Sequence, residues 1–183
     1  MRLVWLAILL VACSGCSSQP ETTASTPPVR KAPATAESRE KVLYEQVRSG
    51  HYQLHSALDP LETATLAAKD LADGQDDPQT KKAVLTLQQD ISGAGSAIAD
   101  YTEDPPSYDE FAKQFDEQDD DRLKAIDGCE KAITMLRDAS SSSEDMLASG
   151  PPAEESKKLG EIKEAVSSAQ SAIEDAKKTL GGR

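Results

Sequence analysis

The sequence predicts an all-α protein, in which an elongated up-down four-helix bundle with antiparallel, coiled-coil-like seams follows a disordered N-terminal tether. Apolar residues recur at alternating spacings of three and four, as they do on the buried stripe of a helix. Clusters of Gly and Pro, which form turns, separate these stretches. Aromatic residues make up only 4% of the chain, which is few for a fold built on β-sheets.

Four stretches carry the helical pattern, and at 1.5 Å per residue they predict helices about 40 to 60 Å long. The expected helices span 38–73, 78–102, 108–148 and 152–180. The second and fourth stripes are the most regular. The second consists of Val84, Leu87, Ile91, Ala94, Ile98 and Tyr101, and the fourth of Leu159, Ile162, Val166, Ala169, Ile173, Ala176 and Leu180.

Two of the expected helices begin with recognisable capping signals. Asp77 can cap the second helix, and Pro78 suits the first helical position, where no amide hydrogen is needed. Ser107 and Glu110 have the spacing of a capping box, in which each side chain satisfies a free amide at the helix start. These signals fix where the second and third helices start.

The first and third stretches depart from the regular pattern. Pro60 lies inside the first, with Asp59 as a candidate cap, but the apolar phase is unbroken and favours a kink over a hairpin. In the third stretch, Asp119 and Arg122 occupy seam positions, so the stripe is weak across 115–126. Either this helix overhangs its neighbours there or its phase shifts.

The first residues of the chain have the profile of a secretory signal. A single cation, Arg2, precedes an apolar run from Leu3 to Ala12, and small residues end the run. Ten residues are too few to cross a bilayer, since a spanning helix needs about 20. We therefore expect residues 1–12 to be a cleaved signal peptide.

The residues Leu10-Val11-Ala12-Cys13 resemble the lipobox of bacterial lipoproteins, a branched apolar residue and two smaller ones before a cysteine. The resemblance implies diacylglyceryl transfer to the Cys13 sulfur, cleavage before Cys13, and acylation of the new amino terminus. Cys16 is the alternative acceptor, although Cys13 then stands where the motif prefers Leu. Ser14 resembles the residue that follows the cysteine in outer-membrane lipoproteins of Gram-negative species.

Residues 13–37 are expected to form a flexible tether, and residues 38–183 the helical domain. The tether is rich in Ser, Thr, Ala and Pro and holds too few apolar residues to offset the entropy of ordering. Two or three acyl chains at its start hold a protein stably on a membrane, whereas one chain does so only marginally. The expected location is the bacterial cell envelope, facing away from the cytoplasm.

The net charge excludes one class of partner. The chain carries −12, and without residues 1–12, which include Arg2, it has 19 basic and 32 acidic residues and a charge of −13. Such a surface repels phosphate backbones, so we expect no nucleic-acid binding. The expected partners are the membrane, through the lipid anchor, and an envelope protein or a second copy of the chain.

One set of residues has the spacing of a metal site. His51, His55 and Asp59 follow one another at intervals of four and therefore share a helix face. Two imidazoles at this spacing can chelate Zn²⁺, Cu²⁺ or Ni²⁺, with the carboxylate as third ligand. The alternative is an incidental, solvent-facing pair. Metal binding is accordingly the second hypothesis for the function.

No other residues predict chemistry. The acidic run 116–121 lacks the glycine and the ligand spacing of a calcium-binding loop, and is expected to be a solvated helix face. Cys129 is expected in the core. No phosphate loop, nucleophile elbow or catalytic triad is recognisable, and no cofactor is implied. The first hypothesis is therefore a non-enzymatic envelope lipoprotein that acts as an interaction or spacer module.

Overall fold

The structure, a computed structural model, describes residues 36–182 and their side chains from residue 39 onward. The signal peptide, Cys13, Cys16 and the tether up to residue 35 lie outside the described residues. All regular secondary structure in 36–182 is helical, which confirms the all-α class. The elements are α1 (Ala36–Ser56), α2 (Leu58–Asp73), α3 (Pro78–Ile98), the 3₁₀ turn η1 (Ala99–Tyr101), α4 (Tyr108–Lys113), α5 (Phe115–Ala148) and α6 (Ala153–Leu180).

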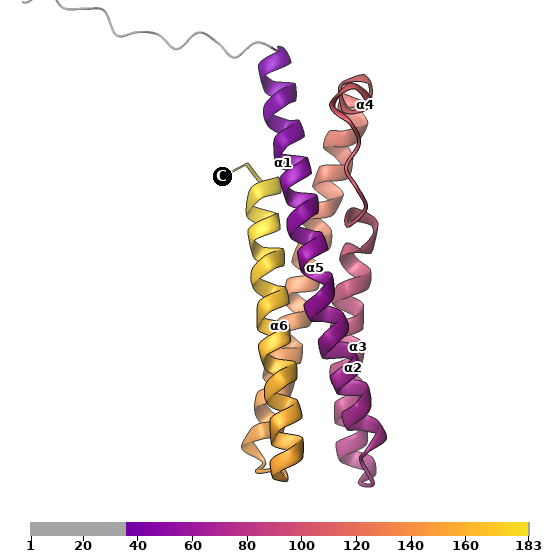
Figure 1. Cartoon of the computed structure of the whole chain (residues 1–183), viewed down its shortest axis with the longest axis vertical. Coiled ribbons are helices and arrows are strands. Elements are labelled where there is room, and N and C mark those ends of the chain that lie inside the picture. Colours follow the sequence, from indigo (N-terminus) through magenta and orange to yellow (C-terminus); the bar gives the residue numbers. More distant parts are fainter. Residues whose placement is uncertain (1–35, 183) are drawn as a thin grey trace, which may run out of the picture. The chain divides into compact units, whose positions relative to one another are not determined.

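The helices form a bundle in which each long helix has helical neighbours on two sides. α2 follows α1 along the bundle, α3 packs against α2 and α5, and α6 packs against α5, α2 and α1 (Figure 1). Because the neighbours lie on adjacent sides, each apolar stripe is buried by two partners. The outward faces carry the charged residues.

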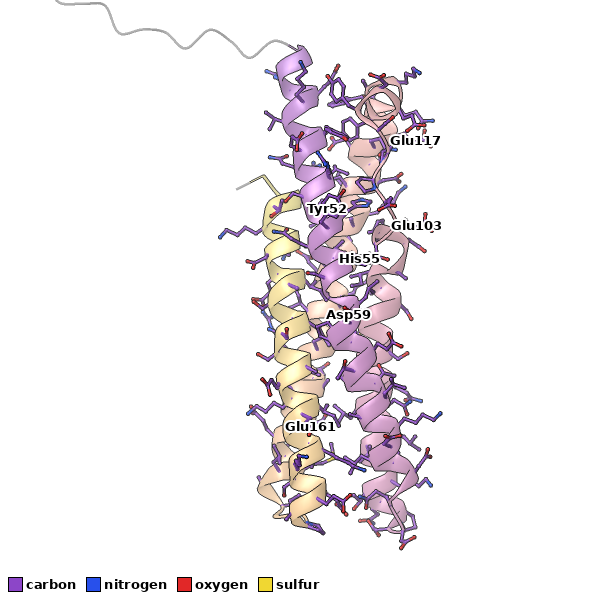
Figure 2. All side chains as sticks on the ribbon, in the orientation of Figure 1. Tyr52, His55, Asp59, Glu103, Glu117 and Glu161 are labelled. Atoms are coloured by element: carbon purple, nitrogen blue, oxygen red, sulfur yellow. The ribbon has the colours of Figure 1, made fainter. Side chains whose placement is uncertain are left out.

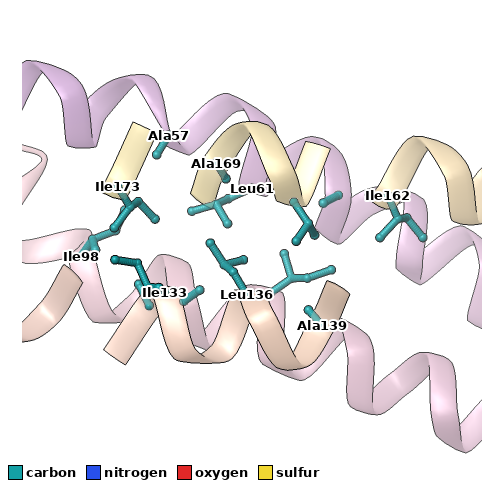
Figure 3. Packing of buried hydrophobic residues seen from close by; sticks show 14 of the residues in the cluster. Ala57, Leu61, Ile98, Ile133, Leu136, Ala139, Ile162, Ala169 and Ile173 are labelled. Carbon is teal, nitrogen blue, oxygen red and sulfur yellow. The ribbon is translucent and has the colours of Figure 1, made fainter. Parts of the chain in front are cut away.

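The two most regular stripes are buried as predicted, except for Tyr101 at the end of the first of them. α3 buries Val84, Leu87, Ile91, Ala94 and Ile98, and α6 buries all seven residues of its predicted stripe. Figure 3 shows Leu136 of α5 pointing toward Leu61 and Ala169 across the core. The core contains alanines among larger Leu, Ile and Val side chains, which lets the helices approach closely.

The first expected helix is interrupted at Ala57, rather than at Pro60 itself. A proline has no N–H for the carbonyl four residues earlier, here that of Ser56, and its ring crowds that carbonyl. The interruption therefore falls one turn before the proline, where the Ala57 N–H donates to the Leu54 carbonyl at 3.0 Å. The chain continues onward instead of turning back, as predicted (Figure 1). The expected cap at Asp59 is wrong, since Ala57 is the N-cap of α2 and no side chain caps it.

The second and third expected helices are each shorter than predicted. The second ends at Ile98 and tightens into η1, so Tyr101 is only partly buried. The third is broken at Gln114, whose φ of −121° and ψ of 32° separate α4 from α5. The capping signal of α4 is confirmed, because the N–H and the hydroxyl of Ser107 both donate to the Glu110 carboxylate, at 3.0 and 2.7 Å.

The part of α5 in which the apolar stripe is weak, residues 115–126, lies beside the C-terminal end of α6. The Arg122 guanidinium donates to the Leu180 carbonyl at 2.6 Å and to the Asp119 carboxylate at 2.7 Å. Arg122 thereby satisfies a carbonyl that has no partner within its own helix. Leu180 in turn occupies the space in which a side chain at Gly50 would lie, 2.6 Å from an ideal Cβ. The overhang is thus confirmed: α5 continues past the point where α6 stops.

Beyond the end of α6, aromatic rings join α1 to α4 and α5. The Tyr44 ring meets Tyr108 and Phe111 edge to face at centroid distances of 5.4 and 5.5 Å. Phe111 also contacts Phe115 at 6.0 Å, across the break at Gln114. Such edge-to-face pairs add about 0.5 to 1.5 kcal/mol each beyond the burial of area. They hold this end of the bundle together where α6 is missing.

Asp77→Ala should lower the thermal midpoint at neutral pH. The Thr80 N–H and hydroxyl both donate to the Asp77 carboxylate at 2.7 Å, and these bonds lower the pKa of Asp77. Because the pKa is lower in the folded state, the cap stabilises the protein at pH 7 and this contribution is lost as the pH falls through the folded-state pKa. We expect circular dichroism melts of the wild type and Asp77→Ala to differ fully above about pH 4, and to converge only as the pH falls below the lowered folded-state pKa of Asp77.

The control for this prediction is Asp76→Ala, which removes the same charge from the preceding exposed residue. We expect its midpoint to stay close to that of the wild type. Equal shifts for the two variants would mean that net charge, and not the cap, determines the effect.

Candidate functional site

The histidines predicted as metal ligands lie in the second half of α1. His51 is partly buried and His55 is exposed, one helical turn further along. Both imidazoles line a cavity of about 240 Å³ between α1 and the connection from η1 to α4. The two side chains that the spacing places on one face therefore do share one site.

The third predicted ligand does not join them. Asp59 lies in α2, beyond the interruption at Ala57, and does not line the cavity. In Figure 2, Tyr52 and His55 lie near the level of Glu103, whereas Asp59 lies farther along the bundle. The helix break is the physical reason, because the regular spacing of four continues only within an unbroken helix.

The connection from η1 to α4 supplies the acidic groups that sequence reasoning missed. Glu103 and Asp104 line the same cavity, together with Tyr52 of α1 and with Thr102 and Pro105. They lie about fifty residues from the histidines in the sequence. No local pattern links the two segments, so the packing of the bundle alone brings them together.

One hydrogen bond determines the tautomer of His51. Its Nδ1 lies 3.0 Å from the backbone carbonyl oxygen of Glu103. A carbonyl oxygen only accepts, so Nδ1 carries the hydrogen and donates it. In the neutral ring the lone pair then resides on Nε2. This is the arrangement in which an imidazole can accept a proton or bind a metal ion through Nε2.

Within the described residues, no group of three or more His, Cys, Asp or Glu side chains is arranged to hold a metal ion. The cavity therefore offers two imidazoles in one turn of helix rather than a complete coordination sphere. Its acidic residues belong to a larger acidic segment.

That acidic segment, residues 103–121, carries much of the negative charge of the chain. It contains nine acidic residues and one basic residue, a net charge of −8 out of −12. In α5, Asp119 pairs with Arg122 and Asp121 with Lys124, each at 2.7 Å. The acidic side chains of the first turn of α5 are exposed and favour the helix dipole there. The segment is a strongly negative surface at one end of the bundle.

No family model matches the chain, and neither the curated proteins nor the solved structures include a match.

Cys129 lies in the core, as predicted. Its side chain is fully buried and free, and burial raises the pKa of the thiol to about 11. A thiol is nucleophilic only as the thiolate, so this environment suppresses the reactivity of Cys129 at neutral pH. Cys129 acts as a small apolar side chain that packs between helices.

A groove of about 840 Å³ runs along α6, lined by small and charged residues of α6 and by Gln53 and Ser56 of α1. The Gln53 Oε1 atom is buried there and accepts no hydrogen bond.

None of the helices between residues 36 and 182 has the length and apolar character needed to cross a bilayer.

Proposed function

We propose that this chain is a lipoprotein of the bacterial cell envelope, acylated at Cys13, with a helical unit displayed outside the cytoplasm. Support comes from Arg2, the apolar run up to Ala12 and the lipobox that ends at Cys13. Cys16 is the alternative acceptor. In a Gram-negative source, Ser14 favours the outer membrane.

We also propose that the helical unit is an up-down four-helix bundle, with α1 and α2 together forming one of its four members. The contacts of α2 with α3, α3 with α5, α5 with α6, and α6 with both α1 and α2 support this architecture. α6, with 28 residues, is about 42 Å long, and α5, with 34 residues, about 51 Å. A bundle of this kind is a stiff element several nanometres long.

The role that this geometry supports best is a non-enzymatic interaction or spacer module. The observation that carries it is the core, in which apolar side chains fill the inward positions of α2, α3 and α6 and of α5 from Ala125 to Ala139. Such a core is packed at the density of a crystal and transmits force instead of yielding. The packed interior makes the bundle stiff, and other molecules contact it at the outer surface.

The charge of the outer surface indicates which kind of partner the helical unit binds. The acidic segment gives one end of the bundle a strongly negative potential, which repels another copy of itself and attracts basic groups. We therefore infer that an envelope partner presents a basic surface to this end. Attraction of this kind weakens with salt, since charges exposed to water are screened.

The anchor is tested by a matched pair of variants, Cys13→Ser and Cys16→Ser, expressed in a bacterial host. We expect Cys13→Ser to lose the acyl mass on its N-terminal peptide and to leave the membrane fraction. Cys16→Ser should stay acylated and membrane-bound. The opposite result would place the anchor at Cys16, and an unmodified N-terminus in the wild type would refute the lipoprotein proposal.

The interaction role is tested by crosslinking the anchored protein in intact envelopes through lysine side chains near the acidic segment. We expect one basic envelope protein to be captured at low salt and its yield to fall at high salt. Capture that does not depend on salt would refute the electrostatic contact. Absence of any captured protein would favour the spacer role alone.

A further inference from the structure

We propose that His51 and His55 form a binding site for one divalent transition-metal ion of the Zn²⁺, Cu²⁺ and Ni²⁺ class. This site lies in the helical unit and does not depend on the lipid anchor or on the interaction role proposed above. It combines the helical spacing of the two imidazoles with a hydrogen bond and a cavity that the sequence does not reveal.

The spacing allows both imidazoles to reach one ion. His51 and His55 are four residues apart in an unbroken part of α1, so their side chains lie one above the other on the helix surface. His55 is exposed and His51 is partly buried, and both border the same cavity. An ion can therefore enter from solvent without unfolding of the helix.

The hydrogen bond prepares His51 for ligation. Metal-binding histidines nearly always donate their second ring N–H to a carboxylate or a carbonyl, which fixes the orientation of the ring and makes it a stronger ligand. The Nδ1–H of His51 donates in this way to the Glu103 carbonyl, at 3.0 Å. Its Nε2 therefore carries the lone pair and is the atom that binds the ion.

The acidic residues around the imidazoles favour the binding of a cation, and the imidazole nitrogens determine which metal ions bind. Glu103 and Asp104 line the cavity beside the imidazoles, and negative charges nearby stabilise a bound cation. Imidazole nitrogen suits Zn²⁺, Cu²⁺ and Ni²⁺, whereas Mg²⁺ and Ca²⁺ take oxygen ligands. With two protein ligands, the remaining coordination positions belong to water. The site is a chelate that binds reversibly, not a structural metal centre.

The test is calorimetric titration with Ni²⁺ of the full chain carrying Cys13→Ser and Cys16→Ser, so that thiols near the N-terminus do not compete. We expect one ion per chain, and an affinity at least about tenfold lower for His55→Gln, which loses one arm of the chelate. Asp59→Asn is the matched control. It removes a carboxylate one turn further along that does not line the cavity, and should change the affinity less than twofold.

A second titration, with Mg²⁺, separates chelation from general attraction to the acidic surface. We expect Mg²⁺ binding to be weak and insensitive to His55→Gln. The proposal is overturned if the reference protein binds no Ni²⁺, if His55→Gln binds Ni²⁺ as tightly, or if Asp59→Asn weakens binding as much. Circular dichroism of each variant without metal verifies that the helices are intact, which exposure of His55 and Asp59 leads us to expect.

Discussion

Leu136→Ala should reduce the free energy of unfolding by about 2 to 5 kcal/mol, the range for a buried leucine whose removal leaves a cavity. Leu136 is fully buried in α5, and its side chain points toward Leu61 and Ala169 in the middle of the core (Figure 3). Ala132 and Ala139, one turn before and after it, are already small, so they cannot fill the space that is left. Urea unfolding followed by circular dichroism measures the change.

The matched control for this substitution is Leu123→Ala in the same helix. Leu123 is 49% exposed, so its truncation removes little buried area and should change the free energy of unfolding by no more than about 0.5 kcal/mol. Similar losses for the two variants would contradict the burial pattern of α5 and the packing of the whole bundle.

Gly128→Ala and Gly160→Ala should have opposite effects on stability. An ideal Cβ at Gly128 lies 2.5 Å from the Ala97 carbonyl oxygen and 3.2 Å from the Tyr101 ring, so the backbone of α3 or α5 must move. Overpacking of this kind costs about 1 to 3 kcal/mol. The gain in helix propensity, about 1 kcal/mol, offsets only part of this cost. We expect Gly128→Ala to be less stable than the wild type.

Gly160, in the interior of α6, provides the comparison. No heavy atom lies within 4 Å of its ideal Cβ, so alanine meets no obstacle there and retains only the propensity gain. Gly160→Ala should therefore stabilise the protein by about 0.5 to 1 kcal/mol. Because both variants replace a helical glycine with alanine, the difference between their stability changes measures the cost of the close approach at Gly128. Stabilisation of both variants would show that α5 does not approach α3 so closely.

Local patterns predicted most of the helices, because the periodic burial of a long helix and its caps depend on residues near one another in the sequence. The stripe of α6 and the cap at Asp77 are examples. The break at Gln114 has no such signal, since Phe111 and Phe115 keep the spacing of an unbroken helix. Tyr44 of α1 packs on Phe111, and Phe111 packs on Phe115 across the break, so the break coincides with contacts between segments that are distant in the sequence.

The candidate site was predictable only in part, for the same reason. The spacing of His51 and His55 places them together, because it lies within one helix. The position of Asp59 depends on a break that Pro60 produces one turn upstream, and the proline alone did not reveal where it would fall. The contribution of Glu103 arises from contact between distant segments, on which a single sequence carries no local information.

The contact of Gly50 with Leu180 has a consequence for the order in which the protein folds. α1 makes its most extensive contacts with α6, the last helix of the described residues, and far fewer with α2, which follows it. Contacts between distant segments form only after the entropy of closing the intervening loop is overcome. We therefore expect α1 to dock late, on a core that α2, α3, α5 and α6 have assembled. During synthesis, α1 leaves the ribosome before the other helices but can pack fully only after α6 has been made.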